Sequence, residues 1–106
     1  MGLPQATMEA GGLRLDPRDE VHHRTRATGP DGRTVTLLLV NISARGLMAR
    51  CDVPYQPGEW LKVNMPVIGT VDAEIRWALG GRIGCQLDKV IPLADYYAVL
   101  AAMVRA

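Results

Sequence analysis

The sequence predicts an all-β domain with one helix, in which six antiparallel strands form a small β-barrel and a C-terminal α-helix follows. Two features of the sequence predict this fold. Residues 71–79 and 83–87 alternate apolar and polar side chains on either side of Gly80-Gly81, which is the pattern of a hairpin with one buried face. From Leu93 to Val104 the apolar residues instead recur at the spacing of a helix.

The first three strands are expected in the N-terminal half of the chain. Residues 20–28 and 33–42 flank the sequence Gly29-Pro30-Asp31-Gly32, which is a strong turn signal, so these two segments form a hairpin. Residues 47–51 form a short third strand, which ends before the loop 54–58 with its prolines and glycine. A fourth strand, at residues 59–65, precedes the hairpin described above.

The helix has recognisable ends. Pro92 fits the first helical position, and Asp95 lies in the first turn, where a negative charge is favoured. The edge with Tyr96 and Met103 is a candidate contact for a partner. The positions expected to pack against the barrel are Leu93, Tyr97, Leu100, Ala101 and Val104.

Length and composition limit the function classes. The 106 residues suffice for one compact domain, expected at residues 13–106 and preceded by a flexible arm at residues 1–12. With 48% hydrophobic residues the chain is globular, and 12 basic against 11 acidic residues leave a net charge of +1. This charge argues against a protein held on long nucleic acid by a broad basic face. A small anion bound by a few arginines remains compatible with it.

The cysteines and the apolar runs indicate a reducing compartment. Cys51 and Cys85 are far apart and form no CxxC motif, so we expect two small core residues rather than a disulfide or a metal site. No signal peptide is recognised, and the longest aliphatic run, residues 37–40, is too short for a membrane span. We therefore expect a cytoplasmic protein without membrane insertion.

The first hairpin brings two polar segments together. If the chain turns between Pro30 and Asp31, Glu20 faces Asn41 and the residues before Glu20 continue beside the segment 41–46. Two arginines, Arg14 and Arg18, then lie next to Asn41, Ser43 and Gly46.

These residues resemble a known signature. Arg14-x-x-x-Arg18 followed by Asn41-x-Ser43-x-x-Gly46 is similar to the paired RxxxR and (D/N)xSxxG motifs of PilZ domains. The resemblance extends from about residue 13 to the end of the chain and includes the hairpin at residues 80–84 and the closing helix. It implies a PilZ-like split barrel and a receptor for cyclic di-GMP, a bacterial second messenger, with no further cofactor.

The resemblance also implies roles for single residues. Arg14 and Arg18 would hold guanine and phosphate, Asn41 and Ser43 would contact a guanine, and Gly46 would permit the turn. Arg45, in the same loop, is a further candidate for phosphate contact. The chemistry agrees, because a guanidinium can bind the O6 and N7 acceptors of guanine in a forked arrangement and forms charge-assisted hydrogen bonds with phosphate.

Some features of the same segments favour plainer roles. Leu13 stands where many PilZ domains have a basic or polar residue, and Asp16, Asp19 and Glu20 place acids beside the expected anion site. Asn41 and Ser43 are also suited to ending a strand and capping a turn.

Catalysis and metal binding find no support in the sequence. The only serine lies in the turn motif, and no G-x-S-x-G or phosphate-binding loop is present. His22 and His23 point to opposite faces of a strand, so they do not form a metal site together. Trp77 falls on the apolar face of its strand and is expected in the core.

Three non-enzymatic functions therefore compete. The first is a cyclic di-GMP receptor whose arginine segment orders on binding and which signals by contact with an effector protein, since 106 residues hold no output domain. The second is a PilZ-like adaptor that binds a protein without nucleotide. The third is a barrel that binds single-stranded nucleic acid through Trp60, Arg24 and Arg26.

Overall fold

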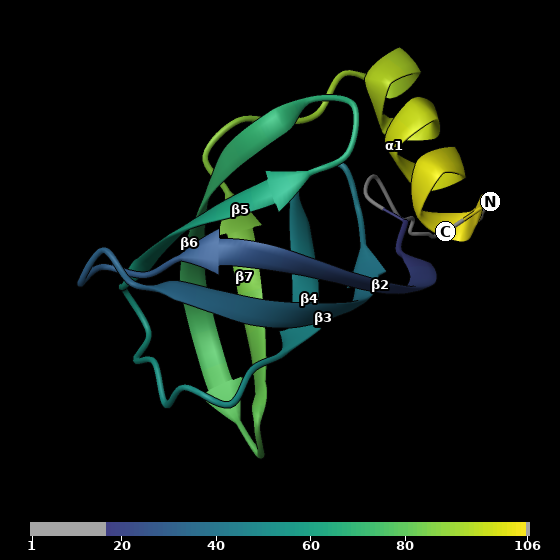
Figure 1. Cartoon of the computed structure of the whole chain (residues 1–106). Helices are drawn as coiled ribbons and strands as arrows, with labels where there is room; N and C mark the ends of the chain where they lie inside the picture. Colours follow the sequence, from purple (N-terminus) through teal and green to yellow (C-terminus); the bar gives the residue numbers. More distant parts are fainter. Residues whose placement is uncertain (1–16, 106) are drawn as a thin grey trace, which may run out of the picture.

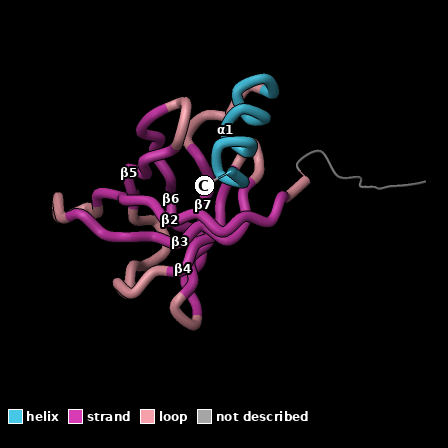
Figure 2. Tube along the Cα trace, turned by 45° about the vertical axis from the view of Figure 1, so that its right-hand side comes forward, coloured by secondary structure: helices cyan, strands magenta, loops and turns pink. Residues whose placement is uncertain are grey.

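Six antiparallel strands form a closed barrel, and one helix lies outside it (Figures 1 and 2). The computed structural model describes residues 17–105, so the expected arm at residues 1–12 and Arg14 lie outside the described part. Around the barrel the strands follow the order β2-β3-β4-β7-β6-β5. This confirms the predicted fold. The elements are β2 (Asp19–Thr28), β3 (Thr34–Ile42), β4 (Gly46–Arg50), β5 (Trp60–Met65), β6 (Gly69–Leu79), β7 (Arg82–Leu87) and α1 (Leu93–Arg105).

The interior of the barrel is filled by the inward-facing half of each strand. In β5 this alternation is complete, since Leu61, Val63 and Met65 are buried while Trp60, Lys62 and Asn64 are exposed. Cys51 and Cys85 are buried free thiols, as predicted. The side chains without any exposed surface are Leu37, Leu39, Ala49, Leu61, Val63, Ala73, Ile75 and Val99.

The pairing of the first hairpin differs from the prediction by one residue near the turn, and a bulge restores the predicted pairing at the start of β2. Thr28 pairs with Thr34 rather than with Arg33, because the turn spans residues 29–33 and the Gly29 N–H donates to the Arg33 carbonyl over 2.9 Å. The register then shifts between Glu20 and His23, so that Glu20 faces Asn41 as predicted. The bulge thus places the start of β2 beside the end of β3.

Helix α1 lies across one end of the barrel, beside the start of β2 (Figures 1 and 2). Its buried side chains are Tyr96, Val99 and Met103, whereas Leu93, Tyr97 and Val104 are exposed. The predicted packing face was therefore wrong by about one residue, although Leu100 is half-buried against the core as expected. Both sides of this helix carry apolar residues at helical spacing, so periodicity alone does not identify the buried one. No helix among the described residues is long and apolar enough to cross a membrane.

One cross-strand pair joins two like charges. Arg50 in β4 is the direct partner of Arg82 in β7, both are exposed, and neither forms an ion pair within residues 17–105. Like charges directly opposite each other destabilise a sheet. We expect Arg82→Glu to raise the free energy of unfolding by about 0.5–1 kcal/mol, measured by urea denaturation. The double variant Arg50→Glu/Arg82→Glu restores a like-charge pair and should lose this gain, and equal stability of all three proteins would contradict the prediction.

Candidate functional site

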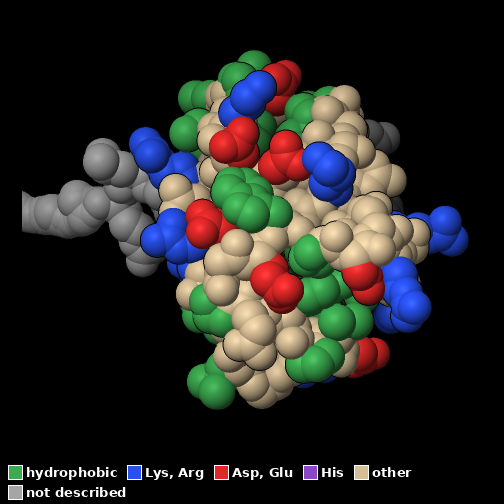
Figure 3. Space-filling model, turned by 90° about the vertical axis from the view of Figure 1, so that its left-hand side faces the viewer, with side chains coloured by type: hydrophobic (Ala, Val, Ile, Leu, Met, Phe, Trp, Pro, Cys, Tyr) green, Lys and Arg blue, Asp and Glu red, His purple; other side chains and the backbone are tan. Residues whose placement is uncertain are grey.

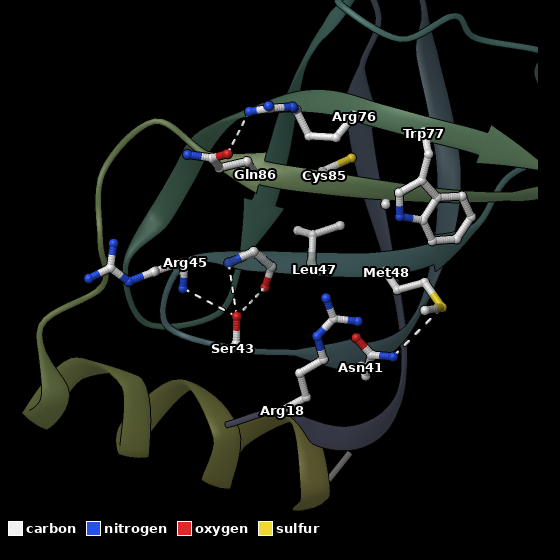
Figure 4. A pocket seen from close by; sticks show the side chains of 12 residues that line it. Arg18, Asn41, Ser43, Arg45, Leu47, Met48, Arg76, Trp77, Cys85 and Gln86 are labelled. Atoms are coloured by element: carbon white, nitrogen blue, oxygen red, sulfur yellow. Dashed lines mark hydrogen bonds between the residues drawn. The ribbon is translucent and has the colours of Figure 1, made fainter. Parts of the chain in front are cut away.

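A groove of about 360 Å³ lies on the outer face of the barrel, over β3, β4, β7 and β6 (Figure 4). It brings together five of the six predicted ligand-binding residues, while Arg14 lies outside the described part. Ligand contact by these residues stays a prediction. The groove is lined by Arg18, Asn41, Ser43, Arg45, Gly46, Leu47, Met48, Arg76, Trp77, Gly84, Cys85 and Gln86.

The floor of the groove is a row of residues that crosses four strands. Asn41 pairs with Met48, Met48 pairs with Gly84, and Gly84 pairs with Trp77. The Asn41 side-chain amide donates a hydrogen bond to the Met48 sulfur over 3.6 Å. The row therefore has an amide at one end and an indole at the other, with an apolar surface between them.

Trp77 belongs to this floor because of a bulge in β6. Ile75 pairs with Cys85 but Trp77 pairs with Gly84, so β6 has one extra residue, Arg76, at this point. The bulge ends the alternation of β6 and leaves Trp77 37% exposed, which contradicts the prediction of a core position. A Cβ at residue 84 would collide with the Trp77 ring nitrogen, so the indole can lie against the strand only because residue 84 is glycine.

The turn at residues 43–46 forms one wall and is held by its own residues. The Ser43 hydroxyl accepts hydrogen bonds from the backbone N–H groups of Arg45 (3.3 Å) and Gly46 (3.1 Å), and the Ser43 N–H donates to the Gly46 carbonyl over 2.9 Å. Ser43 is only 4% exposed. A Cβ on Gly46 would lie 2.5 Å from the carbonyl oxygen of Cys85, so β4 can approach β7 here only with glycine. These contacts support the structural roles considered above for Ser43 and Gly46.

Three arginines surround the groove. In Figure 4, Arg18 extends toward Asn41, Arg45 points outward from the turn, and Arg76 lies on the opposite side. Arg76 donates a hydrogen bond to the Gln86 side-chain oxygen over 2.6 Å. Within residues 17–105, the one carboxylate in ion-pair contact with these arginines is Glu74, 3.9 Å from Arg76. The groove thus offers a local excess of positive charge to an anion.

The surface elsewhere is not uniformly basic. On the face drawn in Figure 3, acidic and basic side chains are interspersed around apolar patches. Trp60, Arg24 and Arg26, which were considered for nucleic-acid binding, are exposed on β5 and β2 and do not line the groove. The positive charge of the groove is therefore a local feature in a chain of net charge +1.

Sequence reasoning missed Arg76, Trp77 and Gln86 as lining residues. The apolar alternation from residue 71 to 79 hides the bulge, because Trp77 and Leu79 are apolar although both are exposed beyond it. The hairpin itself contained one signal, since pairing around Gly80-Gly81 places Arg76 and Gln86 near each other on the polar face.

The Cys85 thiol at the groove is buried. Burial raises the pKa of Cys85 to about 12, and the neighbouring Cys51 adds to this rise. The pKa of Cys51 is also raised, mainly by burial. Both thiols are protonated at neutral pH, so neither supplies a thiolate nucleophile. Nowhere in residues 17–105 do three His, Cys, Asp or Glu side chains come together as a metal site would require.

Comparisons with known proteins identify the family. No curated protein sequence matches the chain. Among solved structures, the PilZ domain of YcgR from Escherichia coli with c-di-GMP is similar in fold, with a TM-score of 0.53 and 16% sequence identity over 85% of this chain and 88% of that chain. The family model for the PilZ domain matches residues 13–106, almost the whole chain. The sequence match and the closed barrel agree, and the chain belongs to the PilZ domain family.

Proposed function

We propose that this chain is a receptor domain for cyclic di-GMP. This ligand carries two guanine bases and two negatively charged phosphates. The observation that supports the proposal is the groove, which three arginines line and whose floor is formed by Asn41, Met48, Gly84 and Trp77. The structural neighbour from Escherichia coli, a member of the same family, was solved with c-di-GMP, which adds support.

Each part of the groove matches one part of the ligand. The Trp77 indole offers a face on which a purine can stack, and base–aromatic stacking contributes about 1–3 kcal/mol per base. Arg18 and Arg14 would bind the guanine edge and the phosphates, and Asn41 would add an amide contact. Arg45 and Arg76 are further candidates for the phosphates. Ser43 and Gly46 would act by holding the turn between these groups.

Binding would also change the surface of the domain. We expect residues 13–18 to close over the groove when the ligand bridges Arg14 and Arg18 to the segment 41–46. An effector protein would bind the changed surface and so distinguish the ligand-bound domain from the free domain. The exposed apolar side chains of α1, Leu93, Tyr97 and Val104, support contact with a protein.

Titration with cyclic di-GMP tests the proposal. Calorimetry should show saturable binding by the wild type, and cyclic di-AMP at the same concentration should bind much more weakly, because adenine lacks the O6 acceptor. Arg14→Ala should bind more weakly than the wild type. In Trp60→Phe, Trp77 is the only tryptophan, and its fluorescence should be quenched when a guanine stacks on it.

The titration also separates the competing function. A wild-type protein that binds no cyclic di-GMP would contradict the receptor proposal. The alternative, an adaptor that binds a protein without nucleotide, predicts this result together with partner binding that survives Arg14→Ala and Arg18→Ala.

A further inference from the structure

A buried tyrosine of α1 contacts both polar segments of the site. The Tyr96 hydroxyl donates a hydrogen bond to the Asp19 carboxylate over 2.5 Å and lies 3.1 Å from the carbonyl oxygen of Ile42. Asp19 directly follows Arg18, and Ile42 stands between Asn41 and Ser43. Tyr96 is 6% exposed, so water competes little for these contacts.

The chain around α1 also holds the rest of the turn. The Leu87 N–H donates to the Arg45 carbonyl over 2.8 Å, and the Ile91 N–H donates to the Ala44 carbonyl over 2.9 Å. Together with Tyr96, these groups contact the carbonyl oxygens of residues 42, 44 and 45. The C-terminal segment therefore fixes the wall of the groove from behind.

We propose that Tyr96 is a positioning residue for the ligand groove and that it links binding in the groove to the docking of α1. This inference rests on the proposed binding of cyclic di-GMP. Neighbouring residues of an extended chain point to opposite sides, so holding the Asp19 carboxylate under α1 directs Arg18 toward the groove, which it lines.

The link acts in both directions. If a docked Tyr96 favours the binding-competent position of Arg18, then the ligand must favour docked Tyr96 by the same factor, because coupling between two sites is reciprocal. Cyclic di-GMP therefore stabilises α1 against local opening, although α1 residues do not line the groove. Through the contact of Tyr96 with Asp19 and Ile42, the local stability of α1 therefore depends on whether the groove is occupied.

Matched tyrosine variants test the positioning role. Tyr96→Phe removes only the hydroxyl, and Tyr97→Phe does the same at the next residue, whose side chain is 61% exposed. We expect Tyr96→Phe to weaken cyclic di-GMP binding about 10-fold, the effect of one hydrogen bond to a charged group, while Tyr97→Phe binds as the wild type does. Circular dichroism and the melting temperature verify that both variants are folded at the assay temperature.

Hydrogen exchange provides a readout that lost stability alone would not change. In the wild type and in Tyr97→Phe, cyclic di-GMP should slow amide exchange in α1. In Tyr96→Phe, saturating ligand should slow exchange in the segment 41–46 but should no longer slow it in α1. Equal affinity and equal ligand-induced protection of α1 in Tyr96→Phe and the wild type would overturn the inference and leave the receptor proposal intact. A wild type that binds no cyclic di-GMP would overturn both.

Discussion

Replacing Arg18 with alanine is expected to weaken cyclic di-GMP binding by about 30- to 150-fold, which corresponds to a loss of about 2–3 kcal/mol. Arg18 is the described member of the RxxxR pair, and it lines the groove beside Asn41 (Figure 4). If Arg18 makes the proposed forked contact to guanine or phosphate, its loss would leave those ligand atoms without a partner. Calorimetric titration at one fixed salt concentration measures the change.

Arg24→Ala is the matched control. Arg24 is an exposed arginine of the same strand region, but it does not line the groove. Both substitutions remove one positive charge, so a general electrostatic effect would weaken binding equally in both variants, and such equality would contradict the assignment of Arg18. We expect Arg24→Ala to bind within about twofold of the wild type, because surface charges farther apart than a Debye length are largely screened.

The second large effect is expected on stability. Gly46→Ala should lower the free energy of unfolding by about 2–3 kcal/mol, since overpacking a tight contact costs about this much. The added Cβ would lie 2.5 Å from the Cys85 carbonyl oxygen, which belongs to the backbone of β7 and cannot rotate away. The two strands must separate, and the turn 43–46 moves with them. Urea denaturation measures the loss, and weaker binding of cyclic di-GMP should accompany it.

Gly32→Ala distinguishes this steric effect from the general cost of replacing a glycine. Gly32 has a φ of 79°, yet a Cβ there would meet no atom within 4 Å. Its replacement should cost about 1–2 kcal/mol through the left-handed backbone alone. Gly46 lies in a strand, so its cost comes from the collision with Cys85. A smaller loss for Gly46→Ala than for Gly32→Ala would show that the strands separate without penalty.

The barrel and one half of the site could be predicted because both depend on local pattern. Alternating residues in β5 and β7 and the turn signal at residues 29–32 indicate the strands. The geometry of the first hairpin then brings Glu20 opposite Asn41. That pairing predicts that the segment with Arg18 lies beside the segment 41–46. Of the residues that the PilZ motifs name, Arg18, Asn41, Ser43 and Gly46 line the groove, and Arg14 lies outside the described part.

The other half of the site depends on features that the hydrophobic periodicity of the sequence does not reveal. The bulge at Arg76 adds one residue to β6 and turns Trp77 outward, although the printed alternation continues to Leu79. Helix α1 is apolar on both sides, so its pattern alone does not decide that Tyr96 rather than Tyr97 is the buried tyrosine. The exposure of Trp77 and the burial of Tyr96 are set by contacts between elements, and the pattern of a single strand or helix does not predict these contacts.

Gly84 shows how a missing atom can set the dimensions of a site. The Trp77 ring occupies the volume that any other residue at position 84 would fill with its β-carbon. Substitutions there would lift the ring and make the groove shallower without touching a charged group. Selectivity for a flat base could therefore be tuned in this chain at a position that contributes no side chain of its own.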